Sequence, residues 1–205
     1  MPFKFESLLE KYERRAAEEA QLMRSLPIEE GMRRRDEFLI SVGPATGQLL
    51  NLLVREHKAQ RVLEIGTSYG YSTLWLADAM RHTGGKVTTL ELHPGKAAYA
   101  EEVMAQAGLT EQVEFLVGDA LASIEATEER FDFVLLDIWK ELYVPCFDRV
   151  LPKLAPGALL IADNMLEPAF NRPEAEAYRA HLSRSRRFDS VLLSVGSGIE
   201  LSRLR

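Results

Sequence analysis

The chain has 205 residues and a formal net charge of -6 at pH 7, with 46% hydrophobic and 27% charged residues. This length suits one well-buried domain, and the composition excludes disordered, collagen-like and low-complexity chains. The acidic balance disfavours a protein that coats nucleic acid, and no apolar run reaches the roughly 18 residues of a membrane helix. We expect a cytoplasmic protein, because the N-terminus lacks a secretory signal. The one cysteine, Cys146, excludes an internal disulfide.

The N-terminal part is predicted to be helical. An apolar stripe indicates a helix from Phe5 to Leu26, which Pro27 closes, and a second short helix is expected over Glu29–Phe38. A turn at Val42 then leads into a third helix that ends near His57. We expect a single domain in which residues 1–40 form a helical lid or appendage and residues 41–205 form the core.

From Arg61 onward, short apolar runs alternate with helical stretches. The predicted strands are Val62–Ile65, Lys86–Leu90, Val113–Val117, Phe131–Leu136 and Ala158–Ala162. This alternation indicates βαβ units and a mostly parallel sheet. Two further runs, Phe188–Val195 and Ile199–Leu204, are separated by three residues and predict an antiparallel hairpin. The expected fold is α/β and doubly wound, a Rossmann-like sheet of seven strands with helices on both faces and a reversed strand at its edge.

The segment Val62–Ser72 is predicted to be a strand, a glycine-bearing turn and a helix start. Gly66 and Gly70 leave room for a ligand close to the backbone. The spacing departs from the G-x-G-x-x-G pattern, and Glu64 places negative charge where a pyrophosphate would need free N–H groups. The turn therefore favours a positively charged ligand.

Two further acids follow the next strands. Glu91 is placed to accept hydrogen bonds from ribose hydroxyls, and Asp119 to meet an adenine amino group, although Asp119 could equally cap the next helix. Because open α/β sheets bind ligands at the carboxyl edge, three acids at successive strand ends predict a nucleoside site there.

A second group of polar residues follows the fourth and fifth strands. Asp137 and Lys140 lie after one strand, and Asp163 and Asn164 after the other. Two carboxylates and an amide carbonyl are hard ligands suited to Mg²⁺, with Lys140 nearby as a base. A solvated surface lysine is the alternative for Lys140.

These motifs resemble the class I S-adenosylmethionine-dependent O-methyltransferases, in particular the metal-dependent branch of catechol and caffeoyl-CoA O-methyltransferases. The similarity covers roughly Phe38 to the end and is nearest to the catechol enzymes, which share the Asp-x-Trp-Lys pattern. Its carriers are Val42–Leu50, Val62–Ser72, Leu136–Tyr143 and Ile161–Asn164. The resemblance implies that S-adenosylmethionine is bound by Val42, Glu64, Gly66, Ser68, Tyr69, Gly70, Ser72, Glu91, Leu92, Asp119, Ala120 and Asp137.

The same resemblance implies a metal site and an acceptor site. Asp137, Asp163 and Asn164 would hold Mg²⁺ or another divalent cation, and Lys140 would be the catalytic base. The implied acceptor residues are Phe38, Trp139, Lys140, Asn164 and Glu200. They predict methylation of one hydroxyl of an adjacent pair on a small aromatic molecule.

Simpler roles exist for several of these side chains. Trp139 could be a core residue, Glu200 could face outward from an edge strand, and Cys146 is expected to be an apolar core residue of its helix. Residues 165–173 match the substrate loops of neither subfamily, which leaves the acceptor open. In such enzymes the region of the first 37 residues lids the pocket or forms a dimer contact, so a homodimer is one expected arrangement.

Two rival functions use the same fold. A tRNA hydroxyuridine methyltransferase is suggested by the basic clusters Arg33–Arg35 and Arg184–Arg187, although the acidic balance counts against nucleic acid. An NAD-dependent dehydrogenase also has a strand, a glycine turn and a later acid, but it leaves Asp137, Lys140 and Asp163 unexplained.

Overall fold

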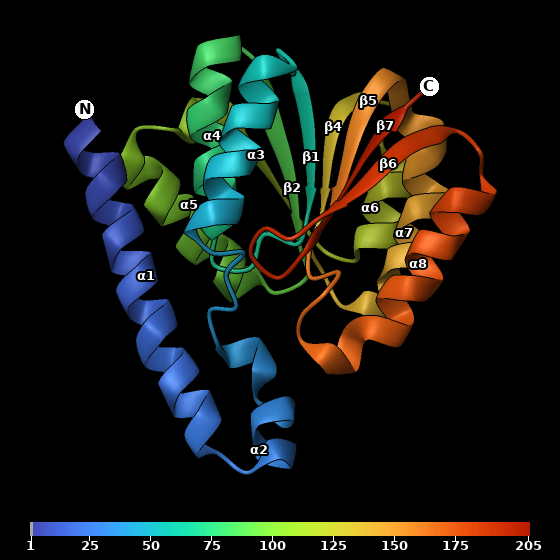
Figure 1. The fold of residues 1–205 in the computed structure, drawn as a ribbon. Helices are drawn as coiled ribbons and strands as arrows, with labels where there is room; N and C mark the ends of the chain where they lie inside the picture. The colour runs from blue at the N-terminus through green and yellow to red at the C-terminus, as the bar shows by residue number, and fades with distance from the viewer. Residues whose placement is uncertain (1) are drawn as a thin grey trace.

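The computed structural model describes residues 2–205, except for the side chains of residues 2, 3, 28 and 32. It contains one seven-stranded sheet in the order β3-β2-β1-β4-β5-β7-β6 (Figure 1). The strands are β1 (Arg61–Ile65), β2 (Lys86–Glu91), β3 (Val113–Val117), β4 (Phe131–Leu136), β5 (Leu154–Ala162), β6 (Phe188–Leu193) and β7 (Ile199–Leu204). The first five are parallel, and β7 runs antiparallel to both of its neighbours.

Helices cover both faces of the sheet, with α3, α4 and α5 on one side and α6, α7 and α8 on the other (Figure 1). The helices are α1 (Pro2–Ser25), α2 (Ile28–Arg33), α3 (Pro44–Glu56), α4 (Tyr71–Thr83), α5 (Pro94–Ala107), α6 (Ala120–Ala126), α7 (Tyr143–Val150) and α8 (Arg172–Arg184). No helix within residues 2–205 is both long enough and apolar enough to cross a bilayer.

Both faces of the central strand β4 are buried. Phe133 and Leu135 pack into the cluster formed with α3 and α4, whereas Val134 and Leu136 pack into the cluster formed with α7 and α8. Side chains alternate between the faces of a strand, so a continuous apolar run marks a strand that is covered on both sides. The predicted doubly wound, Rossmann-like fold with a C-terminal antiparallel hairpin is confirmed, and Cys146 is buried in α7 as expected.

The reversed strand was predicted at the edge of the sheet, but it lies inside the sheet. β7 pairs with β5 on one side and β6 on the other, so β6 is the edge strand. The burial of the two strands explains this order. Four of the six β7 residues are buried, whereas β6 exposes three and buries only Phe188, and the more buried strand takes the inner place.

The N-terminal helices differ from the prediction in two ways. Leu8, Leu9 and Tyr12 pack against the core, but the end of α1 projects beyond the sheet, so only the first half of the predicted apolar stripe is buried (Figure 1). The predicted helix over 29–38 is divided into α2 and a 3-10 turn, η1 (Arg35–Glu37). The backbone hydrogen bonds span four residues up to Arg34, whose N–H donates to the Glu30 carbonyl, and three residues from Glu37, whose N–H donates to the Arg34 carbonyl.

The registers of the parallel strands align three strand ends at one edge. Ile65 of β1 pairs with Leu136 of β4, and Leu136 pairs with Ala162 of β5. The residues that follow, Gly66, Asp137 and Asp163, are therefore neighbours at the carboxyl edge. Closeness at this edge depends on Gly66, whose φ is +108°, because an added Cβ would lie 2.0 Å from the Asp137 carbonyl oxygen.

Substitution of Gly66 by alanine is expected to reduce the free energy of unfolding by roughly 2–5 kcal/mol, because it adds backbone strain and a collision with Asp137. Gly84 is a matched control, since its φ is +78° and an added Cβ there meets nothing within 4 Å. Gly84→Ala should cost only about 1–2 kcal/mol. Urea unfolding of both variants measures the difference, and equal losses would show that the Asp137 contact does not restrict this position.

Candidate active site

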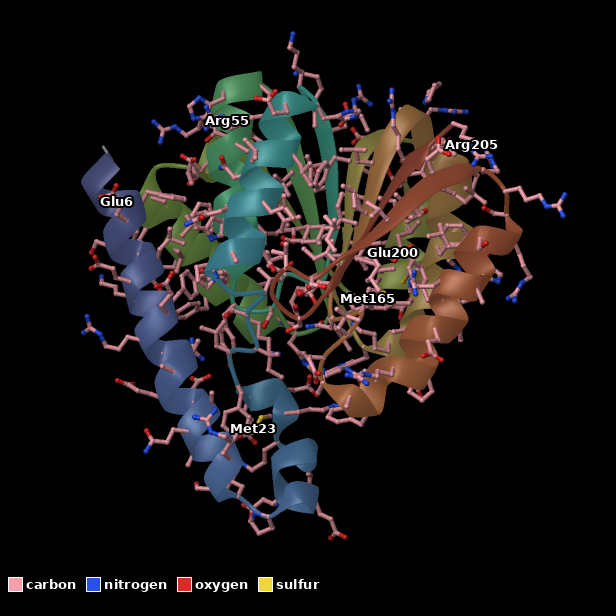
Figure 2. All side chains as sticks on the ribbon, in the orientation of Figure 1. Glu6, Met23, Arg55, Met165, Glu200 and Arg205 are labelled. Atoms are coloured by element: carbon pink, nitrogen blue, oxygen red, sulfur yellow. The ribbon has the colours of Figure 1, made fainter. Side chains whose placement is uncertain are left out.

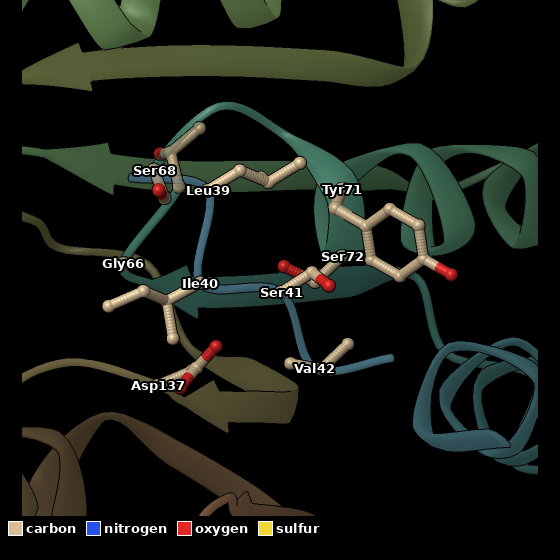
Figure 3. A pocket seen from close by; sticks show the side chains of 10 residues that line it. Leu39, Ile40, Ser41, Val42, Gly66, Ser68, Tyr71, Ser72 and Asp137 are labelled. Atoms are coloured by element: carbon tan, nitrogen blue, oxygen red, sulfur yellow. The ribbon is translucent and has the colours of Figure 1, made fainter. Parts of the chain in front are cut away.

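A pocket lies where the segment after η1 crosses the glycine turn (Figure 3). We call residues Leu39–Val42 the strap. The pocket is lined by the strap, by Gly66–Ser68, and by Tyr71, Ser72 and Asp137. It brings together five of the residues predicted to bind the cofactor, namely Val42, Gly66, Ser68, Ser72 and Asp137.

Glu91 supports this pocket from the end of β2. One carboxylate oxygen accepts a hydrogen bond from the Ser68 N–H at 2.7 Å, and the other accepts one from the His93 N–H at 2.9 Å. Ser68 has a φ of +49°, an uncommon conformation for a residue with a side chain, and this hydrogen bond helps to hold it. Glu91 therefore shapes the glycine turn and lies beside the pocket.

Glu64 is fully buried and points toward hydroxyl groups. Its Oε2 accepts hydrogen bonds from Thr73 at 2.5 Å and Thr89 at 2.6 Å, while its Oε1 has no partner among the described residues. Burial raises the pKa of Glu64 to about 7, although the hydroxyls of Ser72, Thr73 and Thr89 oppose this rise. Glu64 thus lies behind the pocket wall and not on its surface.

The other predicted cofactor residues lie outside the pocket lining. Gly70 adopts φ +88° before α4, Leu92 is 62% exposed, and the exposed Asp119 caps α6 by accepting a hydrogen bond from the Ala122 N–H at 2.9 Å. Ala120 follows as the first residue of α6. The helix-cap alternative for Asp119 thus describes its contact in this structure, and a role toward adenine stays a prediction.

Sequence reasoning missed five pocket residues, which are Leu39, Ile40, Ser41, Thr67 and Tyr71. Thr67 and Tyr71 belong to the glycine motif and could have been included from it. The strap residues Leu39, Ile40 and Ser41 belong to no sequence motif that indicates ligand binding. Their place in the pocket depends on how the appendage folds back over the sheet.

Helix α1 contacts both the glycine turn and the strap. The Tyr12 hydroxyl donates a hydrogen bond to the Tyr69 carbonyl, and the Arg15 guanidinium lies 3.9 Å from the centre of the Tyr69 ring. Glu19 accepts hydrogen bonds from the Leu39 N–H and from Arg15 Nε, the latter at 2.6 Å. Tyr69 therefore turns its side chain toward α1, while its carbonyl and the strap are both tied to that helix.

The predicted metal ligands meet at the ends of β4 and β5. Asp163 is 1% exposed, and neither of its carboxylate oxygens has a hydrogen-bond partner among the described residues. Burial and the nearby Asp137 raise the pKa of Asp163 to about 8, and burial also raises the pKa of Asp137. Asn164 follows with a φ of +54°.

This donor set fits a divalent cation. An unpartnered carboxylate in a buried site is costly unless a cation or donor satisfies it, and two carboxylates with an amide oxygen suit Mg²⁺. Within residues 2–205, no three His, Cys, Asp or Glu side chains gather into a metal-binding group, and the predicted trio of two carboxylates and an amide oxygen stays a prediction.

Lys140 is buried beside the predicted metal ligands. It begins the 3-10 turn η3 (Lys140–Leu142), and its Nζ donates hydrogen bonds to the Tyr143 hydroxyl and, at 3.3 Å, to Asn164 Oδ1. The Tyr143 hydroxyl in turn donates to the Asp163 carbonyl at 3.1 Å. Burial lowers the pKa of Lys140 to about 8, although Asp137 and Asp163 oppose this. The alternative of a solvated surface lysine is wrong, because only 6% of Lys140 is exposed.

Two predicted acceptor residues lie next to the N-terminal arginines. Phe38 is buried directly before the strap, and Trp139 is half-buried directly before Lys140. The Arg35 guanidinium lies 3.9 Å from the centre of the Trp139 ring, so one face of Trp139 is covered by the appendage. Arg34, of the same basic cluster, pairs with Glu30 and Glu37.

Glu200 is not the outward-facing residue of an edge strand that we considered. It is 4% exposed on the inner strand β7, where it pairs with Ala162, and it accepts a hydrogen bond from Arg179 Nε at 2.7 Å. Glu200 and Met165 both lie near the edge where the strands end (Figure 2). A role toward the acceptor stays a prediction for Glu200, which already has a cationic partner.

Comparison with known proteins defines the class. A family model described as O-methyltransferase matches residues 13–205. Catechol O-methyltransferase of Niastella koreensis is 36% identical over 157 residues, which cover 75% of this chain and 70% of that protein. The mouse protein of the same name is 32% identical over 151 residues, which cover 69% of this chain and 55% of that protein.

Solved structures agree with these sequence matches. An O-methyltransferase from Bacillus cereus in complex with SAH has a TM-score of 0.75 at 29% identity, with 97% of this chain and 91% of that chain covered. TomG from Streptomyces achromogenes, in complex with SAM, has a TM-score of 0.73 at 28% identity, with 83% and 85% covered.

The chain belongs to the O-methyltransferase family, and it is an S-adenosylmethionine-dependent enzyme. The predicted resemblance is confirmed, and the dehydrogenase alternative is set aside.

Release of the strap from α1 should weaken cofactor binding. Glu19→Ala removes the acceptor for the Leu39 N–H, and loss of a hydrogen bond to a charged group costs about 1.5–3 kcal/mol. We expect the KM for S-adenosylmethionine to rise at least about tenfold with a smaller change in kcat. Steady-state kinetics measures this, with the exposed neighbour Glu18→Ala as the control. An unchanged KM would contradict a role for this contact.

The buried Glu64 should give stability a dependence on pH. Its pKa is raised from 4.5 to about 7 in the folded state, so its contribution is fully present below about pH 4.5 and is lost as pH rises through 7. The unfolding free energy of the wild type relative to Glu64→Gln, which cannot titrate, should fall by about 3 kcal/mol between pH 4.5 and 8. Urea unfolding across this range tests it, and a constant difference between the two proteins would refute it.

Proposed function

We propose that this enzyme is a Mg²⁺-dependent O-methyltransferase that methylates one hydroxyl of an adjacent pair on a small, catechol-type aromatic acceptor. The observation that carries the proposal is the buried Lys140 beside the unpartnered carboxylate of Asp163. A buried lysine and a buried carboxylate without a hydrogen-bond partner each cost free energy of folding, which favours a functional reason for both. Relatives named catechol O-methyltransferase, at 36% and 32% identity, support the choice of acceptor.

The residues divide the chemistry between them. Residues of the glycine turn would hold S-adenosylmethionine, which would supply an electrophilic methyl group. A divalent cation held by Asp137, Asp163 and Asn164 would supply positive charge that lowers the pKa of an acceptor hydroxyl. Lys140 then accepts the hydroxyl proton at its Nζ, because burial increases the share of its neutral form near physiological pH.

Two structural contacts keep this base in place. The Tyr143 hydroxyl and Asn164 Oδ1 both contact Nζ, and the Tyr143 hydroxyl is anchored to the Asp163 carbonyl. The base is therefore tied to two of the three proposed metal ligands. Orientation of this kind contributes to rate by holding the reacting groups in a productive arrangement.

Methyl transfer to 1,2-dihydroxybenzene tests the proposal, measured with Mg²⁺ and with EDTA. We expect EDTA to abolish activity, and Lys140→Met to lower kcat by about 10²–10⁴ with intact binding of S-adenosylmethionine. The exposed Lys86→Met is the control. Activity that survives EDTA together with Lys140→Met and Asp137→Ala would disprove the mechanism.

A stability measurement tests the metal site without activity. Mg²⁺ at 10 to 100 times its Kd should raise the unfolding free energy of the wild type by about 1.4–2.7 kcal/mol. Asp163→Asn should remove this effect and stabilise the metal-free protein, because it removes an unpartnered buried charge. An equal response to Mg²⁺ in both proteins would place the cation elsewhere.

A further inference from the structure

Arg35 contacts Trp139, a residue of the proposed acceptor site. It begins η1, three residues before Phe38, and its guanidinium carbon lies over the Trp139 ring, 3.9 Å from the ring centre. Trp139 directly precedes Lys140. In Figure 1 the blue segment between α2 and α3, which contains Arg35, approaches the strand ends from the side of α1, and the orange segment before α8 approaches from the opposite side.

The other arginines around this site have acidic partners. Arg34 pairs with Glu37 at 2.9 Å, Arg172 with Glu167 at 3.2 Å, and Arg179 with Glu200 at 2.7 Å. Arg35 differs, because no carboxylate in the described part of the chain forms an ion pair with it. The guanidinium of Arg35 is thus not engaged in an ion pair where η1 meets Trp139.

The contact with Trp139 leaves Arg35 able to bind an anion. The guanidinium carbon lies over the ring, and no group among the described residues accepts a hydrogen bond from the guanidinium, so its N–H groups stay available. These N–H groups form a planar fork that matches a carboxylate with two parallel hydrogen bonds. The Trp139 ring thereby fixes the orientation of Arg35 and reduces the entropy lost on binding.

We propose that Arg35 is a specificity-determining residue that binds the carboxylate of the acceptor, so that the preferred substrate is an aromatic acid with two adjacent hydroxyls. This inference rests on the proposed function, because it places the two hydroxyls at the metal site and Lys140. An acceptor that carries an amine at the same position would meet a like charge, which makes Arg35 a discriminating element as well as an attractive one.

The test compares acids with their neutral esters. We would measure kcat/KM for 3,4-dihydroxybenzoate and 3,4-dihydroxycinnamate, each against its methyl ester, so that charge changes while the ring and the hydroxyls stay the same. The two acids differ in reach, which covers both a short and a long distance from the metal site to Arg35. The variants are Arg35→Gln, Arg35→Lys and the exposed control Arg33→Gln.

The wild type is expected to favour at least one acid over its ester by about tenfold or more. Arg35→Gln should lower kcat/KM for that acid by about ten- to a hundredfold, the range for loss of a charged hydrogen bond, and change the ester by less than about threefold. Arg35→Lys should retain part of the preference, because it keeps the charge but loses the planar fork. Arg33→Gln should match the wild type.

Three outcomes would overturn the inference. If the wild-type kcat/KM is the same for each acid and its ester, an anion site does not contribute to the choice of acceptor. Equal losses for acid and ester in Arg35→Gln would mean that Arg35 only packs against Trp139. If the wild type methylates none of the four compounds and 1,2-dihydroxybenzene also fails, the proposed function itself is wrong, whereas methylation without preference removes only the role of Arg35.

Discussion

The register between β1, β4 and β5 is the constraint on which the site depends. It places Gly66, Asp137 and Asp163 side by side at one edge, and the glycine permits the β1 and β4 turns to approach until only a hydrogen atom fits between them. A slip of one residue would exchange the side chains that β4 packs against the helices on its two faces, and it would also separate the carboxylates. The packing that stabilises the sheet thus also sets the spacing of the chemistry.

Buried charge distinguishes this edge from the rest of the core. Asp163 and Lys140 are buried, Asp137 is half-buried where it lines the pocket, and the carboxylate oxygens of Asp163 have no hydrogen-bond partner in the described part of the chain. Such an arrangement costs stability unless a cation completes it, and the same burial brings the pKa of Lys140 close to physiological pH. The burial that lowers the stability of the fold therefore also favours the neutral form of the proposed base.

The N-terminal appendage belongs to the site and is more than a cover. α1 holds the glycine turn through Tyr12 and the strap through Glu19, while Arg35 reaches Trp139 beside the proposed base. One appendage thus contacts both the pocket at the glycine turn and the residue beside the proposed base. Its residues have no shared chemical signature, and this explains why the acceptor could not be specified from the motifs of the core alone.

The sequence by itself determined the fold class, the strand positions and the polar residues at the strand ends, because apolar periodicity and punctuation by glycine and proline are local signals. It also carried the O-methyltransferase resemblance in its motifs. Only the tertiary structure decided the contacts that join distant segments, such as Glu19 with Leu39, Arg35 with Trp139 and Arg179 with Glu200. The tertiary structure also decided the inner position of β7 and the full burial of Glu64. They depend on which surfaces meet when the chain packs, and no local pattern encodes that choice.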